Sequence, residues 1–358
     1  MKTLKYTIAL LALCSIATSC KKTPAEEIVT PVSTDLNAEI LSSISSNVAE
    51  ATYYDLSVKA DQLYAAVQKF DTVTNDVNLA VCKQLWRDTR AVWEQSEGFL
   101  FGPVATNNID PRIDTWPVDY VALDSLMNSS VVFSETYVNT LDDALRGFHP
   151  IEYLLFGTGG NKTATQFTAR EKAYLKALSV NLKNLISQLW VSWDPAISGN
   201  YGANITNAGK PTSVYSTKRA VYEEIVNSMI GICEEVANGK IEEPFAAQNP
   251  LLEESPFSYN SITDFTNNMR SVQNVYLGKY LVDGKGLEEL VRVNNLSLDA
   301  SIKTKMNAAI AALNNVTVPF GQAIISQPIQ ITNAQNAIND LKTTLENDLL
   351  PFIKTSVN

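Results

Sequence analysis

The sequence predicts an all-α protein built from two packed helical bundles that are approximately duplicated. Apolar residues recur every three or four positions through most of the chain, whereas the alternation typical of strands is scarce. Loops rich in Gly, Pro, Asn and Ser separate the helical stretches, which is the arrangement expected of helical bundles.

Each helix is predicted from its own stripe of apolar residues, which gives about ten helices in all. The stripes run from Leu36 to Val48, Leu56 to Val67, Tyr174 to Leu189, Val221 to Val236, Ile302 to Leu313 and Ile338 to Leu349. Thr168 and Glu171 have the spacing of a capping box ahead of the third stripe. Gly239 follows the fourth stripe, where a C-terminal cap belongs.

A loop over residues 240–261 is long enough to divide two helical halves, and a short repeated pattern supports the division. Phe99-Leu100-Phe101-Gly102 ends a helix that begins near residue 80, and Val275-Tyr276-Leu277-Gly278 ends one that begins near residue 262. Duplication leaves such an echo, although chance produces it as readily. We therefore expect a first bundle region over 35–245 and a second over 246–358.

The first residues have the pattern of a bacterial lipoprotein signal. Lys2 and Lys5 precede a short apolar run, and small residues lead to Cys20. The run falls short of the roughly 20 apolar residues that span a bilayer, so we expect residues 1–19 to be removed and Cys20 to be acylated. Residues 20–34 lack periodicity and are predicted to be a tether. The mature protein is then anchored by lipid in the cell envelope, on the periplasmic or the surface face of the outer membrane.

The charge of the chain excludes some classes of partner. With 38 acidic and 28 basic side chains the formal net charge is -10, which does not suit nucleic acid or an anionic lipid surface but tolerates cations. Membrane contact is therefore expected only through the lipid on Cys20. Two cysteines remain in the body of the chain, Cys82 and Cys233, and they form either a disulfide bridge or two buried small hydrophobic residues.

His149 is the only histidine in the chain, and it stands three positions before Glu152 in Gly147-Phe148-His149-Pro150-Ile151-Glu152. Zinc sites of the His-Glu-x-x-His and His-x-x-Glu-His types need a second histidine, and the fifth position here is Tyr153. Two interpretations of the pair remain. A helix that starts at Pro150 makes His149 its N-cap and needs no ligand, or both side chains converge on a metal ion.

A second motif mixes two tryptophans with charged residues. Trp86, Arg90, Trp93 and Glu97 are spaced four, three and four residues apart, so they share one face of a helix, and Glu94 lies beside that face. The motif is either a buried Arg90–Glu97 pair beneath the tryptophans or a face on which Glu97 points into a site. In the second case Arg90 sets the charge and orientation of Glu97.

Two further segments supply candidate residues. In the loop over 110–119, Asp114 is a candidate hard-oxygen ligand, whereas the other acids suit turns or caps. Ser261 and Asp264 have the spacing of a capping box for the helix that begins near residue 262. A serine nucleophile is disfavoured because it needs a base and the single histidine is committed elsewhere.

Together these motifs resemble the imelysin family. The resemblance rests on Gly-x-His-x-x-Glu, on the preceding Trp-x-x-x-Arg-x-x-Trp-Glu-x-x-Glu-Gly-Phe-x-Phe-Gly-Pro and Ile-Asp-x-Trp-Pro-x-Asp, and on the stretch from Glu254 to Gly278. It spans residues 36–356. It implies two helical bundles related by approximate duplication, in an envelope protein linked to iron acquisition, and the family is also filed among metallopeptidases.

Carried over to this chain, the resemblance implies a metal site with a shell of cofactor-binding residues beside it. The expected metal ligands are His149, Glu152, Glu97 and Asp114, and the expected cofactor-binding residues are Arg90, Ser258 and Asp264. One imidazole nitrogen among carboxylate oxygens suits iron, with zinc as the alternative metal.

Three functions remain open. In the first, the lipid-tethered protein captures an iron cation and passes it to a receptor or permease of an uptake system. In the second, a metallopeptidase uses His149 and Glu152 as catalytic residues, although only carboxylates are left as further zinc ligands. In the third, the residues orient an organic ligand or a peptide in a cleft, or His149 ligates haem. The carboxylate-rich set favours cation binding over hydrolysis.

Overall fold

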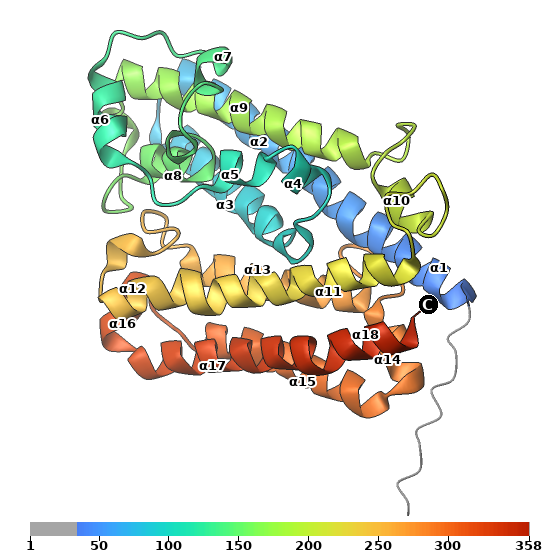
Figure 1. The fold of residues 1–358 in the computed structure, drawn as a ribbon. Helices are drawn as coiled ribbons and strands as arrows, with labels where there is room; N and C mark the ends of the chain where they lie inside the picture. The colour runs from blue at the N-terminus through green and yellow to red at the C-terminus, as the bar shows by residue number, and fades with distance from the viewer. Residues whose placement is uncertain (1–33, 358) are drawn as a thin grey trace, which may run out of the picture. The chain divides into compact units, whose positions relative to one another are not determined.

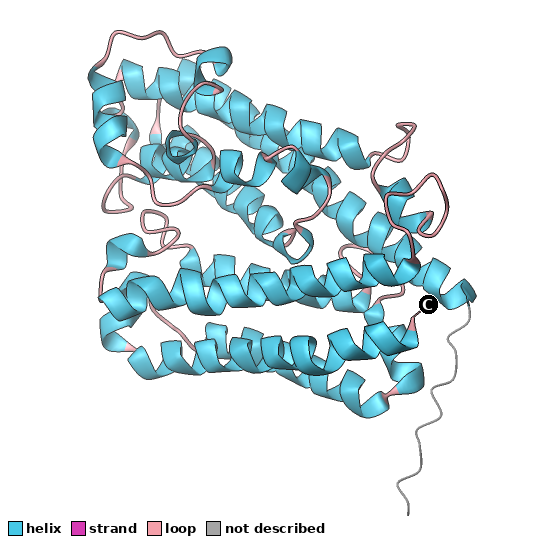
Figure 2. Cartoon of the chain, in the orientation of Figure 1, coloured by secondary structure: helices cyan, strands magenta, loops and turns pink. Residues whose placement is uncertain are grey.

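Helices form the regular secondary structure of residues 34–357, which are the residues that the computed structural model describes, and no strand occurs in that range (Figure 1, Figure 2). The predicted all-α class is confirmed. The predicted signal peptide, and the predicted tether up to residue 33, lie outside the described residues. Within 34–357, no helix combines the length and the apolar character that a bilayer span requires.

One four-helix bundle, which we call the α2 bundle, is built around helix α2. Its helices are α2 (Ala51–Thr72), α3 (Asp76–Glu94), α8 (Phe148–Phe156) and α9 (Ala169–Trp193). Helix α2 packs against α3 and α9, and α8 packs against the same two helices. The predicted stripe of α9 faces this core, since Tyr174, Leu178 and Leu185 are buried.

A second group, which we call the α13 bundle, consists of α11 (Lys218–Glu235), α13 (Ser261–Leu277), α15 (Leu296–Asn314) and α17 (Pro328–Thr344). Helix α15 packs against α13 and α17, and α11 contacts these two helices as well. The described residues, 34–357, all belong to one unit by their contacts. Helix α11 thus packs with helices that follow residue 245, and the domain limits expected from the loops stay a prediction.

Shorter helices and single turns connect these eight helices. The remaining α-helices are α1 (Thr34–Ser43), α4 (Pro103–Thr106), α5 (Ile109–Asp114), α6 (Tyr120–Asn128), α7 (Glu135–Val138), α10 (Gly202–Thr206), α12 (Glu242–Ala247), α14 (Leu287–Asn294), α16 (Phe320–Ser326) and α18 (Leu350–Ser356). The 3-10 turns are η2 (Glu97–Phe99), η3 (Asp143–Leu145), η4 (Ala164–Gln166) and η6 (Pro250–Leu252), and the π-helical segments are η1 (Ile44–Glu50), η5 (Val236–Ile241) and η7 (Leu345–Leu349).

Helix α9 begins as the sequence predicts. The Thr168 side chain accepts a hydrogen bond from the backbone N–H of Glu171 at 3.1 Å, and the Glu171 carboxylate accepts one from the backbone N–H of Thr168 at 2.8 Å. Two backbone donors that the first turn leaves without partners are satisfied in this way. The predicted capping box is confirmed.

Two helix ends differ from the prediction. Helix α3 stops at Glu94 instead of continuing toward Gly102, and the Ser96 hydroxyl closes its last turn by donating to the Trp93 carbonyl at 2.7 Å. The chain also passes Gly239 without a break, because α11 continues through η5 into α12. Gly239 lacks the positive φ that a C-terminal cap requires, so it is an ordinary helical position.

The expected capping box at the start of α13 does not form. Asn260 precedes the first turn and makes no side-chain cap. The Ser261 hydroxyl donates instead to Glu253 Oε2 at 2.8 Å, and the Asp264 carboxylate accepts from the Ser255 hydroxyl at 2.7 Å. Both residues are buried, and their side chains bind residues of the preceding loop rather than the backbone N–H groups of the first helical turn.

Helices α3 and α13 pack against each other, and their contact is polar. Asn268 on α13 donates to Glu94 Oε2 on α3 at 2.6 Å, and Arg87 on α3 donates at 3.0 Å to the carbonyl of Ser258, in the loop before α13. Buried polar residues of this region include Arg90, Glu94, Glu97, Glu254, Ser258, Asp264, Asn267, Asn268 and Ser271. A helix contact with this many buried charges is uncommon, since most buried ionisable groups are costly unless paired.

Cys82 and Cys233, the two cysteines in the described range, are buried and unpaired. Burial raises the pKa of each thiol to about 12. They are therefore neutral small hydrophobic residues, which is one of the two alternatives that the sequence leaves open.

Gly147 explains how α8 begins. The helix starts at Phe148, so the alternative in which Pro150 opens it and His149 is its N-cap is wrong. Gly147 is the residue before the first turn, with φ 84° and ψ -154°, a conformation that is essentially restricted to glycine. A Cβ atom at this position would lie 2.2 Å from the carbonyl oxygen of Ile113 on α5. The glycine therefore allows the backbones of α8 and α5 to approach.

We expect Gly147→Ala to lower the free energy of unfolding by about 2 kcal/mol or more, because it combines a strained φ with a backbone clash. Urea denaturation measures the effect. Gly239→Ala is the matched control, since its Cβ would meet nothing within 4 Å. There the substitution is expected to be neutral or to stabilise by up to about 1 kcal/mol. An equal change in the free energy of unfolding for Gly147→Ala and Gly239→Ala would contradict the conclusion that the close approach of α8 and α5 requires Gly147.

Candidate metal centre

His149 lies on α8, fully buried between two acids. Its Nε2 atom is 3.1 Å from Asp114 Oδ1, and its Nδ1 atom is 3.6 Å from Glu152 Oε2. Neither nitrogen makes a well-directed hydrogen bond. Burial opposes the charged imidazolium, but the facing carboxylates of Asp114 and Glu152 outweigh it and raise the pKa of His149.

Glu152 connects α8 with the loop that precedes α13. Its Oε1 atom accepts three hydrogen bonds, from the backbone N–H of Phe257 at 3.1 Å, from the backbone N–H of Ser258 at 2.7 Å and from the Ser258 hydroxyl at 2.6 Å. Its Oε2 atom faces His149 and makes no hydrogen bond. The structure therefore brings three of the expected residues, His149, Glu152 and Ser258, into one chain of contacts.

Arg90 is fully buried at the centre of a group of acids. Its Nη2 atom lies 2.5 Å from Glu94 Oε1 and 2.8 Å from Glu254 Oε1, its Nη1 atom contacts Asp114, and its Nε atom lies 3.8 Å from Asp264. Burial alone would lower the pKa of Arg90, but these four acids hold it well above its ordinary value. The guanidinium is therefore a permanent positive charge.

The alternative of a buried Arg90–Glu97 pair is wrong. Because α3 ends at Glu94, Glu97 lies in the following 3-10 turn and not on the stripe that contains Arg90. Its Oε2 atom accepts from Asn268 at 2.7 Å and from Lys240 at 3.0 Å. The acid that pairs with Arg90 along the helix is Glu94, at the i,i+4 spacing that favours such pairs.

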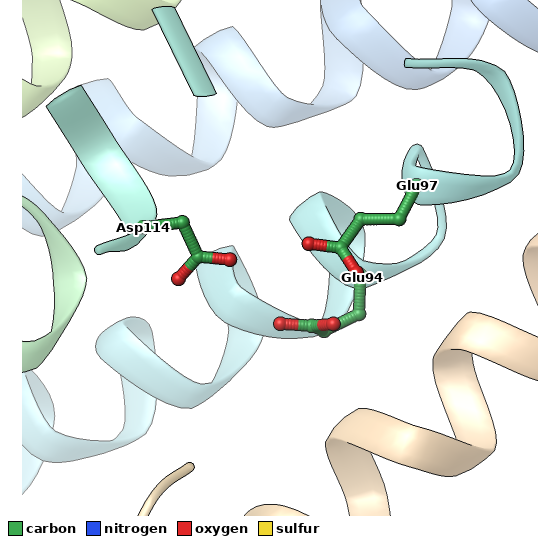
Figure 3. A group of neighbouring side chains, drawn as sticks. All are labelled: Glu94, Glu97 and Asp114. Carbon is green, nitrogen blue, oxygen red and sulfur yellow. The ribbon is translucent and has the colours of Figure 1, made fainter. Parts of the chain in front are cut away.

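Glu94, Glu97 and Asp114, which we call the acidic trio, each offer a carboxylate oxygen, and these three oxygens lie within 4.8 Å of one another. They come from α3, η2 and α5, and Figure 3 shows the carboxylates directed toward the same space. Burial raises the pKa of Glu94 to about 7, although Arg90 and Lys240 oppose this shift. Burial and then the charge of Glu94 raise the pKa of Glu97 well above its ordinary value.

Asp114 differs from the other members of the trio. Its burial would raise its pKa, but Arg90 and His149 outweigh that effect and hold the pKa well below its usual range. Its second oxygen accepts a hydrogen bond from the Trp93 indole N–H at 2.6 Å. Asp114 is therefore the one member that is ionised under all ordinary conditions.

Lys240 is a second buried cation that the sequence does not reveal. Its Nζ atom lies 2.7 Å from Glu254, 3.0 Å from Glu97, 3.5 Å from Glu235 and 3.7 Å from Glu94. It lies on η5, a π-helical segment of the kind that is frequent at functional sites. A helix that ends at Gly239 would leave Lys240 in a loop, so the sequence alone gives no reason to include Lys240 in the site.

A pocket of about 320 Å³ connects two members of the trio, Glu97 and Asp114, with the surface. Its acidic lining residues are Glu97, Asp110, Asp114, Glu235, Glu243 and Glu254, and Lys240 and Trp116 also line it. We call it the acidic pocket. The Glu235 side chain is 53% exposed, whereas Glu97 is 3% exposed, so the pocket leads from solvent to buried carboxylates. Burial, followed by the charge of Asp114, raises the pKa of Asp110 to about 7.

Polar atoms without hydrogen bonds gather around the acidic pocket and His149. Within the described residues they include both nitrogens of His149, Glu152 Oε2, Glu94 Oε1, Glu254 Oε2 and Asn268 Oδ1. A buried polar atom left unsatisfied costs about 1–3 kcal/mol, and a concentration of them at one place points to an ion or water that satisfies them. These atoms are three carboxylate oxygens, one amide oxygen and the two nitrogens of one imidazole, although Glu94 Oε1 is also ion-paired with Arg90. Oxygen donors with one imidazole fit a hard or borderline cation.

The raised carboxyl pKa values predict how stability depends on pH. Folding raises the pKa of Glu94 from 4.5 to about 7, of Asp110 from 3.8 to about 7, and, through burial, of Glu253 from 4.5 to about 8. The folded state therefore holds these protons more tightly, and its stability falls as the pH rises toward 8. The pKa of Asp114 is lowered instead, so its ionised carboxylate stabilises the folded state, and this stabilisation is lost only in strong acid.

In buffers that contain a chelator, we expect the thermal unfolding midpoint to fall by several degrees between pH 5 and pH 8. Differential scanning calorimetry measures it. Glu253→Gln removes one of the titrating groups and should flatten the decline, whereas the exposed Glu243→Gln should leave it unchanged. A midpoint that rises with pH would contradict the assigned shifts.

The chain has clear relatives among known proteins. The sequence model of the family described as Imelysin matches residues 49–347. The iron-regulated protein A of Synechococcus elongatus is 30% identical over 312 residues, which are 86% of this chain and 84% of that protein.

Two solved structures share the fold. A protein from Parabacteroides distasonis, described as an iron-regulated protein A precursor, has a TM-score of 0.83 at 26% identity, over 92% of this chain and 97% of that chain. An imelysin-like protein from Psychrobacter arcticum has a TM-score of 0.76 at 14% identity, over 92% of this chain and 99% of that chain, which is a likeness of fold alone. The family match contains the acidic trio, His149 and Glu152. The chain belongs to the imelysin family.

Proposed function

We propose that the protein binds a metal cation, iron, at the inner end of the acidic pocket and takes part in iron acquisition. The observation that carries the proposal is the surplus of buried carboxylates. Arg90 and Lys240 are the two basic side chains that form ion pairs among Glu94, Glu97, Asp114, Glu254 and Asp264. An incoming cation would displace protons from acids whose pKa is raised, and its positive charge would compensate the carboxylates that are left.

In this proposal the acidic trio supplies the oxygen ligands, and His149, which lies outside that 4.8 Å group but has its Nε2 atom 3.1 Å from Asp114, supplies a nitrogen ligand beside Asp114. The imidazole must lose a proton to do so, because only neutral histidine ligates a metal. Glu152 is the orienting partner of His149. One of its oxygens is occupied by three hydrogen bonds from Phe257 and Ser258, and the other faces Nδ1, as is common beside metal-bound histidines.

The expected cofactor-binding residues, Arg90, Ser258 and Asp264, contact the proposed ligands or their neighbours. Arg90 holds Glu94 and Asp114 in place, and Asp264 borders Arg90 at 3.8 Å while accepting a hydrogen bond from Ser255. Arg90 and Asp264 thus face each other and neighbouring acids, and both the backbone N–H and the hydroxyl of Ser258 are committed to Glu152. We therefore assign Arg90, Ser258 and Asp264 to positioning, not to direct contact with the cation.

Iron is proposed because of the donor chemistry and the relatives. Carboxylate oxygens with one imidazole suit iron, whereas protein zinc sites are richer in histidine and cysteine. The relative from Synechococcus elongatus is named an iron-regulated protein. Lipid anchoring at Cys20 in the cell envelope, and transfer of the cation to a receptor or permease, belong to the same proposal.

Titration of the purified protein with Fe²⁺ under anaerobic conditions tests the proposal. We expect one equivalent to bind, and Glu97→Gln to weaken the binding by about tenfold or more because it removes one charged ligand of similar shape. The control is Glu243→Gln, which removes a charge from the exposed rim of the same pocket. Equal affinity of the Glu97 variant and the wild type would exclude the acidic trio as the site.

The same preparation separates cation binding from the peptidase alternative. A metallopeptidase of this family would use His149 and Glu152 in catalysis, so a mixture of peptides is incubated with the metal-loaded protein and analysed by mass spectrometry. We expect no cleavage above that of the His149→Ala variant. Cleavage that both a chelator and His149→Ala abolish would replace the binding proposal with hydrolysis.

A further inference from the structure

We infer that Lys240 is a built-in competitor for the cation: its ammonium group occupies the place beside Glu97, Glu94 and Glu254 where the cation binds, and the cation must displace it. The inference rests on the proposed function and adds a determinant of affinity and selectivity to it.

The geometry around Lys240 is that of a bound cation. Four carboxylates surround its Nζ atom at distances from 2.7 to 3.7 Å, and two of them belong to the acidic trio. Asn268 donates to the same Glu94 and Glu97 oxygens from the opposite helix, at 2.6 and 2.7 Å. A metal ion bound by Glu94 and Glu97 would share their charge with the ammonium at close range, and two cations at such a separation repel each other strongly.

Lys240 is able to leave, whereas Arg90 is not. The Arg90 guanidinium is fully buried, engages Glu94, Asp114 and Glu254, and lies 5.2 Å from the ring centroid of Phe148. The Lys240 side chain is 12% exposed and ends in the wall of the acidic pocket on a flexible stem of four carbons. The pocket volume of about 320 Å³ leaves room for that stem to move.

Glu235 can pair with the ammonium of Lys240 after its displacement. Glu235 lies 3.5 Å from Lys240 Nζ, and its side chain is 53% exposed toward the pocket mouth. When Lys240 turns outward it exchanges the buried acids for Glu235 in solvent, so displacement leaves no buried charge unpaired. A monovalent ion would replace one unit charge by another and gain little. A multivalent cation adds charge to the surplus of acids, so Lys240 favours multivalent ions over monovalent ones.

The test compares the affinity of three full-length proteins for Fe²⁺ by anaerobic calorimetric titration. Lys240→Met keeps the length of the side chain and removes the charge, and we expect it to tighten binding by about tenfold or more. Lys279→Met makes the same change of net charge at a half-exposed lysine whose ion pair is with Asp283, and its affinity should stay within about twofold of the wild type. Unchanged or weaker binding by Lys240→Met, with intact binding by the wild type, would overturn the inference alone.

A second measurement needs no variant. Amine acetylation of the wild-type protein, read by mass spectrometry, should increase at Lys240 when Fe²⁺ saturates the protein, because the ammonium moves into solvent. Lys176, which is 45% exposed, is the internal reference. Protection of Lys240 by Fe²⁺ would mean that the ion closes over the lysine instead of displacing it. Absence of Fe²⁺ binding to the wild type and to both variants would overturn the proposed function as well.

Discussion

The rest of the structure depends on the burial of Arg90 among four acids from separate parts of the chain. Glu94 and Arg90 share α3, Asp114 ends α5, Glu254 lies in the loop before α13, and Asp264 lies on α13. A buried ion pair contributes little net stability, but the loss of one partner is very costly. The arginine therefore acts less as a source of stability than as a constraint: it is satisfied only when the α2 bundle and the α13 bundle are brought together as they are here.

The burial of Arg90 also keeps the acidic residues close together despite their mutual repulsion. One guanidinium and one ammonium cannot neutralise every carboxylate around them, and burial shifts the remaining acids toward their protonated forms. A protein that only needed a stable core would replace these acids by apolar side chains of similar volume. This protein keeps the surplus of buried carboxylates next to a pocket that reaches solvent. Such a pattern is expected where a protein gives up stability in order to bind a ligand.

Periodicity alone predicted the all-α class, and neighbouring residues in the sequence predicted part of the centre. His149 and Glu152 could be paired because they are three residues apart on one helix, and Asp114 and Arg90 because their residue types suit such a site. Lys240 and Glu254 could not be found in this way, because Lys240 meets Glu97 across 143 residues of sequence and Glu254 meets Arg90 across 164, and such contacts leave no periodic signal. A helix that extends to Glu97 places Glu94 beside the face that contains Arg90, whereas the helix ends at Glu94 and Arg90 pairs with Glu94. Local rules thus describe elements well, but the composition of a buried polar site is decided by tertiary contacts.

The position of His149 also has a spectroscopic consequence. As the only histidine of the chain it contributes a single set of imidazole resonances, which needs no assignment by mutagenesis. Its two nitrogens face different acids, Asp114 from α5 and Glu152 on its own helix, so the chemical shifts of Nε2 and Nδ1 report the two sides of the centre independently. One nitrogen-15 spectrum of selectively labelled protein therefore follows protonation, tautomer and ligation at the point where the fold concentrates its charge.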